Sequence, residues 1–385
     1  MKDLFLLNPE INYLNHGSFG ACPKEVFEKY QGYQRMLEAD SVQFMTKKGP
    51  ELMDVSKKAL ARFINCAQED LIFVTNPSTA MNTIIKSLDL KEGDEVLSTN
   101  QEYGAVDRTW NFMSKQYGVK YIKSNIQLPL TSKEQFLEDF WSGLTNRTKV
   151  VCLSEITSHT ALIFPVKEII DKAKELGLIT IIDGAHVPAH ISLDIEELDP
   201  DFYTGACHKW LLAPKGCSFL YARKNVQSML DPLIVSWGYE AQFPSDSQYQ
   251  DYHQYQGTRD FSAFLTIGDC LDWMDKHNWL NKTAQSKKML QHYYPIVANE
   301  LNSHVLCPVT DEFLGQICSF PIQTSDAFGL KETLFQDYKI EIPIMNNVGP
   351  IVYTRISFQP YVTETDIEHF INAIREIKSD TNLLT

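Results

Sequence analysis

Short apolar runs rich in β-branched residues alternate with stretches of helical periodicity between residues 71 and 204. In residues 166–176, for example, Val166, Ile169, Ile170 and Ala173 keep the i, i+3, i+4, i+7 spacing of one helix face. We expect strands at residues 71–75, 95–98, 121–124, 149–154, 178–183 and 201–204. Strands that are apolar on both faces must be covered on both sides. The alternation therefore predicts an α/β fold with a mostly parallel, doubly wound sheet.

The C-terminal part of the chain follows a different order. We expect a long helix, two strands and an amphipathic helix there, at residues 282–302, 315–321, 352–358 and 364–377. Strands followed by helices are typical of an α+β unit. The length of 385 residues corresponds to about two domains. We therefore predict an N-terminal arm, a large domain and a small α+β C-terminal domain, at residues 1–20, 21–280 and 281–385.

Charge and composition exclude several classes of partner. The chain has 49 acidic and 35 basic side chains, a net charge of −14, and no long run of Lys and Arg, so we expect no nucleic acid partner. No stretch approaches the about 20 apolar residues that cross a bilayer, and the N-terminus lacks the pattern of a signal peptide. The eight cysteines form no CxxC pair, which argues against a zinc site and a disulfide framework. We expect a cytoplasmic protein with no membrane partner.

Polar residues follow the expected strands, where parallel sheets bind their ligands. Ser78 or Thr79 can cap the helix after the first strand. The free N–H groups at the start of this helix can hold a phosphate, although the segment can also be an ordinary helix start. Asp183 ends an apolar strand, where a carboxylate needs a cation. His208 and Lys209 follow the next strand, and a crowded lysine can act as an amine nucleophile, although a single lysine is more often solvated.

The order of these signals resembles one known family. The segments that carry the resemblance are YLNHGSFGACP (13–23), EYGAV (102–106), TSHTALIFPV (157–166), DGAHVP (183–188), CHKW (207–210), VSWG (235–238), QGTRD (256–260) and TRISFQPYVT (354–363). Together they are similar to the class V aminotransferase family of fold-type I pyridoxal 5'-phosphate (PLP) enzymes, in its isopenicillin N epimerase-like branch. The resemblance implies the aspartate aminotransferase-like architecture, with PLP as the cofactor and an amino-acid-type substrate.

The resemblance also implies a catalytic role for three residues. Lys209 corresponds to the Schiff-base lysine, which also moves a proton at the substrate Cα. Asp183 corresponds to the partner of the pyridinium nitrogen, and keeps that nitrogen protonated. His186 lies three residues further on and is expected near the phenolic oxygen of PLP.

Further residues are implied in cofactor binding. Tyr103 takes the position at which the family stacks an aromatic ring on the cofactor, and Ser158 stands where many relatives carry Asn. The phosphate group is expected to contact Ser78, Thr79, Ala80 and His208. Gly257 and Thr258 are expected to reach the phosphate of a neighbouring subunit, so the resemblance implies a homodimer with shared active sites.

The expected substrate site centres on Arg355, whose guanidinium suits a carboxylate. The N-terminal residues His16, Gly17 and Ser18 are expected to touch the substrate, although His16 can equally belong to a turn stabilised by Gly17 and Gly20. No metal is expected: His186 and His190 are four residues apart, but Pro188 lies between them and no HExxH motif occurs.

The motifs indicate the cofactor more specifically than they indicate the reaction. We predict an amino-acid epimerase or racemase, with β-elimination by a C–S lyase acting on a cysteine-derived sulfoxide, or transamination, as alternatives. A non-catalytic PLP-binding homologue is a further alternative, against which the presence of Lys209 and Asp183 argues. Cysteine desulfurases of the family carry a catalytic Cys before the substrate-binding Arg. Residues 341–354 contain no Cys, so we expect no desulfurase activity. The aromatic-rich residues 249–255 are expected to form a loop or an interface.

Overall fold

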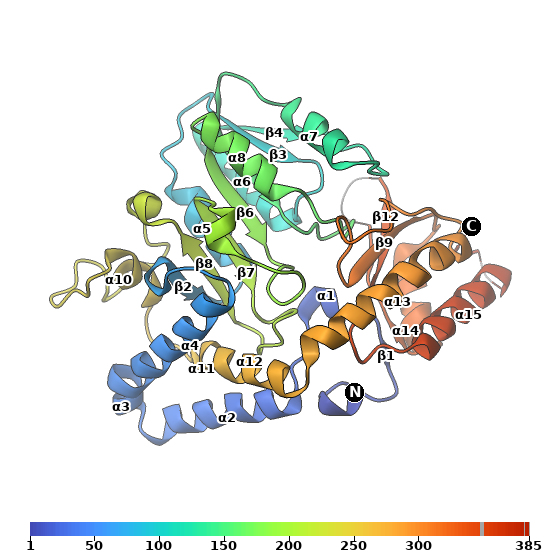
Figure 1. The fold of residues 1–385 in the computed structure, drawn as a ribbon, viewed down its shortest axis with the longest axis horizontal. Coiled ribbons are helices and arrows are strands. Elements are labelled where there is room, and N and C mark those ends of the chain that lie inside the picture. The colour runs from blue at the N-terminus through green and yellow to red at the C-terminus, as the bar shows by residue number, and fades with distance from the viewer. Residues whose placement is uncertain (347–349, 381, 385) are drawn as a thin grey trace.

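The computed structural model describes residues 1–346, 350–380 and 382–384. Within these residues, seven strands form a central sheet in the order β2-β8-β7-β6-β5-β3-β4 (Figure 1). The strands are β2 (Leu71–Val74), β3 (Glu95–Thr99), β4 (Lys120–Ser124), β5 (Thr148–Ser154), β6 (Ile179–Gly184), β7 (Phe202–Ala206) and β8 (Ser218–Ala222). The strands from β7 to β4 are parallel to one another, whereas β8 is antiparallel to both β2 and β7. The predicted mostly parallel sheet is confirmed.

Strand β8 was not predicted from the sequence. The chain leaves β7, passes through Gly216 at φ +86° and returns antiparallel, with all five residues of β8 buried. The apolar run of β8 is short and no helix precedes it, so its sequence does not indicate that it inserts between β2 and β7.

Helices cover both faces of the sheet, as a doubly wound fold requires. Successive residues of one strand point to opposite faces: in β6, Ile181 joins the apolar cluster beneath α5 and α6, and Ile182 joins the larger cluster that contains α4, α7 and α8. The helices of the two layers are α4 (Gly49–Phe63), α5 (Pro77–Ser87), α6 (Gly104–Tyr117), α7 (Lys133–Trp141) and α8 (Val166–Glu175).

The remaining helices of the N-terminal and central parts frame this body. They are α1 (His16–Phe19), α2 (Lys24–Ala39), α3 (Ser41–Gln43), α9 (Ile195–Leu198), α10 (Gln248–Gln254), α11 (Ser262–Leu265) and α12 (Ile267–Lys276). The expectation of a loop at residues 249–255 is wrong, because Ser247 caps a helix there by accepting a hydrogen bond from the Gln250 N–H. Figure 1 shows α10 at the left edge of the molecule, far from the C-terminal part.

The C-terminal part is built on a small antiparallel sheet. Its elements are α13 (Trp279–Glu300), β9 (Ile317–Ile322), α14 (Ala327–Gln336), β10 (Ile340–Glu341), β11 (Ile344–Met345), β12 (Val352–Ser357) and α15 (Glu364–Asp380). The sheet has the order β11-β12-β9, and α13 runs to it from the large body (Figure 1). Strand β10 pairs in parallel with β1 (Asn12–Tyr13). The N-terminal segment therefore lies against the C-terminal part of the chain.

Among the described residues, no helix is both long enough and apolar enough to span a membrane.

Candidate active site

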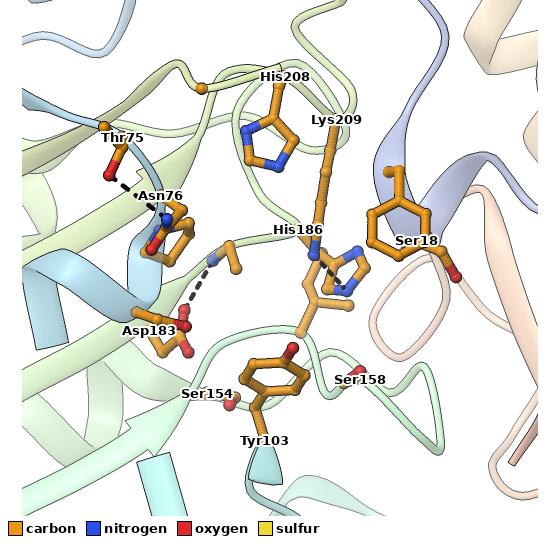
Figure 2. Close-up of a pocket in the computed structure, with 16 residues that line it drawn as sticks. Ser18, Thr75, Asn76, Tyr103, Ser154, Ser158, Asp183, His186, His208 and Lys209 are labelled. Atoms are coloured by element: carbon orange, nitrogen blue, oxygen red, sulfur yellow. Dashed lines mark hydrogen bonds between the residues drawn. The ribbon is translucent and has the colours of Figure 1, made fainter. Parts of the chain in front are cut away.

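A cavity of about 420 Å³ opens at the carboxyl ends of the parallel strands (Figure 2). Its walls come from the segments that follow β2, β3, β5, β6 and β7, and from α1. The lining residues are Ser18, Phe19, Thr75, Asn76, Pro77, Ser78, Tyr103, Ser154, Ile156, Ser158, Asp183, Ala185, His186, His208, Lys209 and Gly216. The fold thus brings together eight residues that the sequence analysis proposed for the site: Ser18, Ser78, Tyr103, Ser158, Asp183, His186, His208 and Lys209.

Lys209 lies in the loop after β7 and its side chain reaches into the cavity (Figure 2). Its Nζ atom lies 3.1 Å from Nε2 of His186. Burial, and secondarily the positive charge of Arg355, lower the pKa of Lys209 from 10.5 to about 7, while Asp183 acts in the opposite direction. A large fraction of this amine is therefore neutral near pH 7 and can accept a proton.

The loop of Lys209 is held from behind by the N-terminal segment. Gly20 has φ +69°, and a Cβ atom there would lie 2.1 Å from the carbonyl oxygen of His208 and 3.0 Å from Cα of Lys209. Only glycine combines this backbone conformation with so close an approach. The NHGSFG motif therefore shapes the site from outside the cavity as well as from its wall.

Asp183 is the last but one residue of β6 and is buried. Its Oδ1 accepts a hydrogen bond of 3.0 Å from the N–H of Ala185, the only donor to this carboxylate among the described residues. Burial raises the pKa of Asp183, although that N–H and the charge of Lys209 lower it. A carboxylate with so few donors has an unmet need for a cation, as the sequence analysis expected.

The N-terminus of α5 forms another wall of the cavity. The expectation that Ser78 or Thr79 caps this helix is wrong: Asn76 is the cap, and its Oδ1 accepts a 2.9 Å hydrogen bond from the N–H of Thr79. The reason is Pro77, which has no N–H and a fixed φ and so suits the first position of the helix. Ser78 still faces the cavity, whereas Thr79 and Ala80 do not line it. The helix start remains an anion-binding feature.

His208 stands opposite that helix start (Figure 2). Its Nδ1 donates to the carbonyl oxygen of Cys217 at 3.0 Å, which fixes the ring. Burial lowers the pKa of His208 to about 4 in the protein alone. Nε2 becomes a donor when the ring takes up a second proton, and a nearby phosphate dianion favours that form.

Directly before Tyr103 in the sequence is a buried carboxylate that the sequence analysis missed. Glu102 accepts hydrogen bonds from the hydroxyl of Thr99 at 2.6 Å and from the N–H and hydroxyl of Ser154 at 2.9 and 2.7 Å. Burial raises the pKa of Glu102 to about 7. Its place in the EYGAV motif, directly after a strand, was the available signal. The bonds to Glu102 fix Ser154, which lines the cavity, and join the ends of β3 and β5.

Arg355 lies on β12, behind the cavity wall rather than on it. Its guanidinium donates to the carbonyl oxygen of Ser158 and, at 3.1 Å, to the hydroxyl of Ser18. Burial lowers the pKa of Arg355 to about 10, so the group stays charged at pH 7. Its Nε has no hydrogen-bond partner among the described residues.

Two other N-terminal residues of the proposed substrate site are buried. His16 contacts the hydroxyl of Tyr361 at 2.8 Å and the carbonyl oxygen of Lys209 at 3.1 Å. Gly17 donates its N–H to the hydroxyl of Ser357. Of this motif, only Ser18 and Phe19 line the cavity.

Gly257 and Thr258 do not line the cavity of Lys209. Gly257 instead lines a second cavity, of about 510 Å³, with Lys57, Trp237, Phe243 and other residues. The side chains of Trp237 and Phe243 are almost fully exposed, at 86% and 87%.

The family model of the class-V aminotransferases matches residues 13–370. The chain belongs to this family. The isopenicillin N epimerase of Amycolatopsis lactamdurans is 28% identical to this class-V aminotransferase over 96% of both chains. A probable chloroplastic L-cysteine desulfhydrase of Arabidopsis thaliana is 24% identical over 97% of this chain and 84% of the relative. A solved structure of a C-DES mutant with glycine covalently linked to PLP has a TM-score of 0.82 at 17% identity, covering 97% and 98% of the two chains.

These matches establish fold type I and a PLP-dependent class-V enzyme. The residues of the cavity fit the cofactor. The buried carboxylate of Asp183 suits the ring nitrogen, the N-terminus of α5 with Ser78 and His208 suits the phosphate, and the low pKa of Lys209 suits an amine that binds an aldehyde. The individual roles of these residues belong to the proposal below.

Proposed function

We propose that this member of the class-V family transfers protons at the Cα atom of an amino-acid-type substrate, and that its reaction is an epimerisation. The observation that carries the proposal is the buried amine of Lys209, which has a pKa of about 7 and faces a cavity that holds a buried carboxylate. PLP, when bound, withdraws electrons from the Cα–H bond. The epimerase names of relatives that align along 96% of both chains support this reaction.

Each residue then has a defined task. Lys209, in its neutral form, accepts the proton from Cα. Asp183 keeps a positive charge on the ring nitrogen of the cofactor. Arg355 attracts the substrate carboxylate, because its charged guanidinium lies directly behind Ser18 and Ser158 of the cavity wall and donates to both. The N-terminus of α5 holds the phosphate.

An epimerase must return the proton from the side opposite to the base. The side chain of Tyr103 enters the cavity from the side opposite to the main chain of Lys209 (Figure 2). We assign the return of the proton to its hydroxyl. In Tyr103→Phe, inversion should fall by at least about 10²-fold, the scale of a lost general acid, while exchange of the α-proton through Lys209 persists. Equal losses of inversion and exchange would remove Tyr103 from this role.

The second candidate is β-elimination of a cysteine-derived substrate. The relatives named L-cysteine desulfhydrase and hercynylcysteine sulfoxide lyase favour it. The same removal of the α-proton by Lys209 begins this reaction, and a leaving group on Cβ then departs. The two reactions thus share the site and differ in the substrate.

A panel of amino acids incubated with the enzyme in deuterated water separates the candidates. Deuterium at Cα with inversion supports epimerisation, and it is the expected result. Pyruvate and ammonia from a cysteine derivative would instead support the lyase. A keto acid with aminated cofactor would support transamination and overturn both.

A further inference from the structure

Trp210, directly after Lys209, is buried and contacts the site through one hydrogen bond. Its indole Nε1 donates to Nδ1 of His186 at 3.3 Å. Its ring lies between two other histidines, with the centroid of His190 at 3.9 Å in a stacked arrangement and that of His16 at 5.0 Å. The indole is thereby fixed in place, and its N–H points at the histidine that contacts Lys209.

The indole N–H can only donate. Nδ1 of His186 must therefore accept, so in the neutral ring the proton resides on Nε2. This N–H lies 3.1 Å from Nζ of Lys209, and an ammonium group, which has no lone pair, cannot accept it. The hydrogen bond from Trp210 to His186 and the one from His186 to Lys209 are therefore compatible with a neutral Lys209 amine and not with a charged one.

We propose that Trp210 is a positioning residue that sets the tautomer of His186 and thereby favours the neutral amine of Lys209. The proposal rests on the role of Lys209 given above, and explains how the chain prepares that amine before any cofactor or substrate is present. It concerns residues of this chain alone.

The surrounding histidines do not supply an alternative proton. His190 donates from Nδ1 to the carbonyl oxygen of His186 and accepts the Gln316 N–H at Nε2, at 2.8 and 2.5 Å. His16 donates from Nε2 to the carbonyl oxygen of Lys209 and so accepts from the Tyr361 hydroxyl at Nδ1. Both rings are therefore neutral with one defined tautomer.

The cations around His186 act in the same direction as the indole N–H. The cations that face His186 are Lys209 and Arg355, and burial together with these charges lowers the pKa of His186. Lys209 itself faces Arg355, which lowers its pKa, and Asp183, which raises it. Removing the indole N–H leaves these groups unchanged but allows the ring proton of His186 to move to Nδ1. Nε2 can then accept a hydrogen bond from the Lys209 ammonium, which stabilises the charged form of the amine.

The test uses the full-length chain prepared without cofactor. Trace labelling with acetic anhydride at a series of pH values, read from the peptide that contains Lys209, reports the fraction of neutral amine. In Trp210→Phe, which keeps a buried aromatic ring, the midpoint should rise by about one pH unit, a tenfold higher proton affinity. The matched control is Trp279→Phe, because Trp279 is also buried and its indole N–H has no partner among the described residues. This control should leave the midpoint in place.

An unchanged midpoint in a folded Trp210→Phe chain, or an equal shift in Trp279→Phe, would overturn the proposal. A second measurement needs no Trp variant. The ¹⁵N spectrum of His186, assigned with His186→Gln, should show a pyridine-type Nδ1 and a pyrrole-type Nε2 in the unchanged protein. The reverse pattern would overturn the proposal. Neither readout requires turnover, so a chain without epimerase activity still tests the role of Trp210.

Discussion

The burial of Lys209 links the chemistry of one side chain to the stability of the folded chain. Its pKa is 10.5 ordinarily and about 7 in the fold, so between these values the unfolded chain binds a proton that the folded chain lacks. The contribution of this group to the free energy of unfolding therefore rises with pH through this window, on the order of 1 kcal/mol per pH unit. It is complete above about pH 10.5 and is lost as the pH falls from there to about 7.

Lys209→Met removes this titration and keeps a side chain of similar length. Without cofactor, we expect the variant to have its largest stability advantage over the unchanged chain near pH 7. That advantage should shrink as the pH rises towards about 10, by the linkage just given. Denaturant unfolding of both chains at several pH values measures it. A difference that is constant with pH would show that Lys209 titrates normally in the fold.

Asp183→Asn separates cofactor binding from catalysis. The phosphate contacts at α5 and His208 remain, so we expect the variant still to bind PLP. The amide cannot hold a positive charge on the ring nitrogen, so exchange of the substrate α-proton should slow by on the order of 10²-fold or more. Titration with PLP followed by α-proton exchange in deuterated water measures the two effects. Near-normal exchange would remove Asp183 from the mechanism.

Single residues also show what a sequence can and cannot predict. Asp183 and Lys209 were found because a charged group directly after an apolar strand of a parallel sheet falls at the ligand-binding edge. The cap at Asn76 was missed because Pro77 moved the helix start by a residue. Trp210 and Glu102 were missed for another reason: their importance lies in hydrogen bonds to His186 and Ser154, and such pairings arise only once the strands are side by side.

At the scale of elements, β9 and the connection between β11 and β12 bear on the expectation that this chain has no desulfurase activity. The connection has no Cys, and residues 347–349 within it lie outside the described residues. The nearest upstream thiol is Cys318, fully buried in β9, where burial raises its pKa well above the ordinary value. A thiol in this state is a poor acceptor of sulfur.

We therefore expect no protein-bound persulfide after incubation with PLP and cysteine. Mass spectrometry of the intact chain measures it, with Cys318→Ser as the matched variant and a cysteine desulfurase as the positive control. A persulfide on any cysteine of the chain would contradict the prediction.

The variant Arg355→Ala should raise KM and lower kcat together, since a misplaced substrate carboxylate also misaligns the Cα–H bond.

Elements differ in how well their sequence patterns predict them. The parallel strands of the large body were predicted within a few residues, because short apolar runs such as those of β5 and β6 alternate with helical stretches. Strand β8 (SFLYA) contains no β-branched residue and runs antiparallel, and its insertion between β2 and β7 depends on pairing with β2, which is far away in the sequence. Residues 249–255 were expected to form a loop or an interface, and α10 was missed because its cap, Ser247, lies outside this aromatic stretch.

At the scale of the whole molecule, the cavity joins three distant parts of the chain. The N-terminal segment pairs with β10, and its His16 contacts both Tyr361 and the loop of Lys209. Arg355 on β12 donates to Ser18 of that segment and to Ser158 of the large body. The C-terminal part therefore helps to position Ser18 in the cavity wall. The sequence showed these motifs but not their contacts.

Gly257 lies outside the cavity of its own Lys209, in a region whose exposed Trp237 and Phe243 suit burial against another subunit. We propose a homodimer in which Thr258 of one chain completes the site that contains Lys209 of the other. Lys209→Ala and Thr258→Lys chains should each be inactive alone. When they are unfolded and refolded together, about half of the dimers are mixed, and each mixed dimer has one intact site.

The mixture should therefore recover about a quarter of the wild-type activity. Activity assays and the mass in solution measure this outcome, with each variant refolded alone as the control. If Thr258 acted within its own chain, no dimer of any composition would contain an intact site, and the mixture would stay inactive. A fully active monomer would contradict the shared site in a different way, because then no second chain would be needed to complete the cavity.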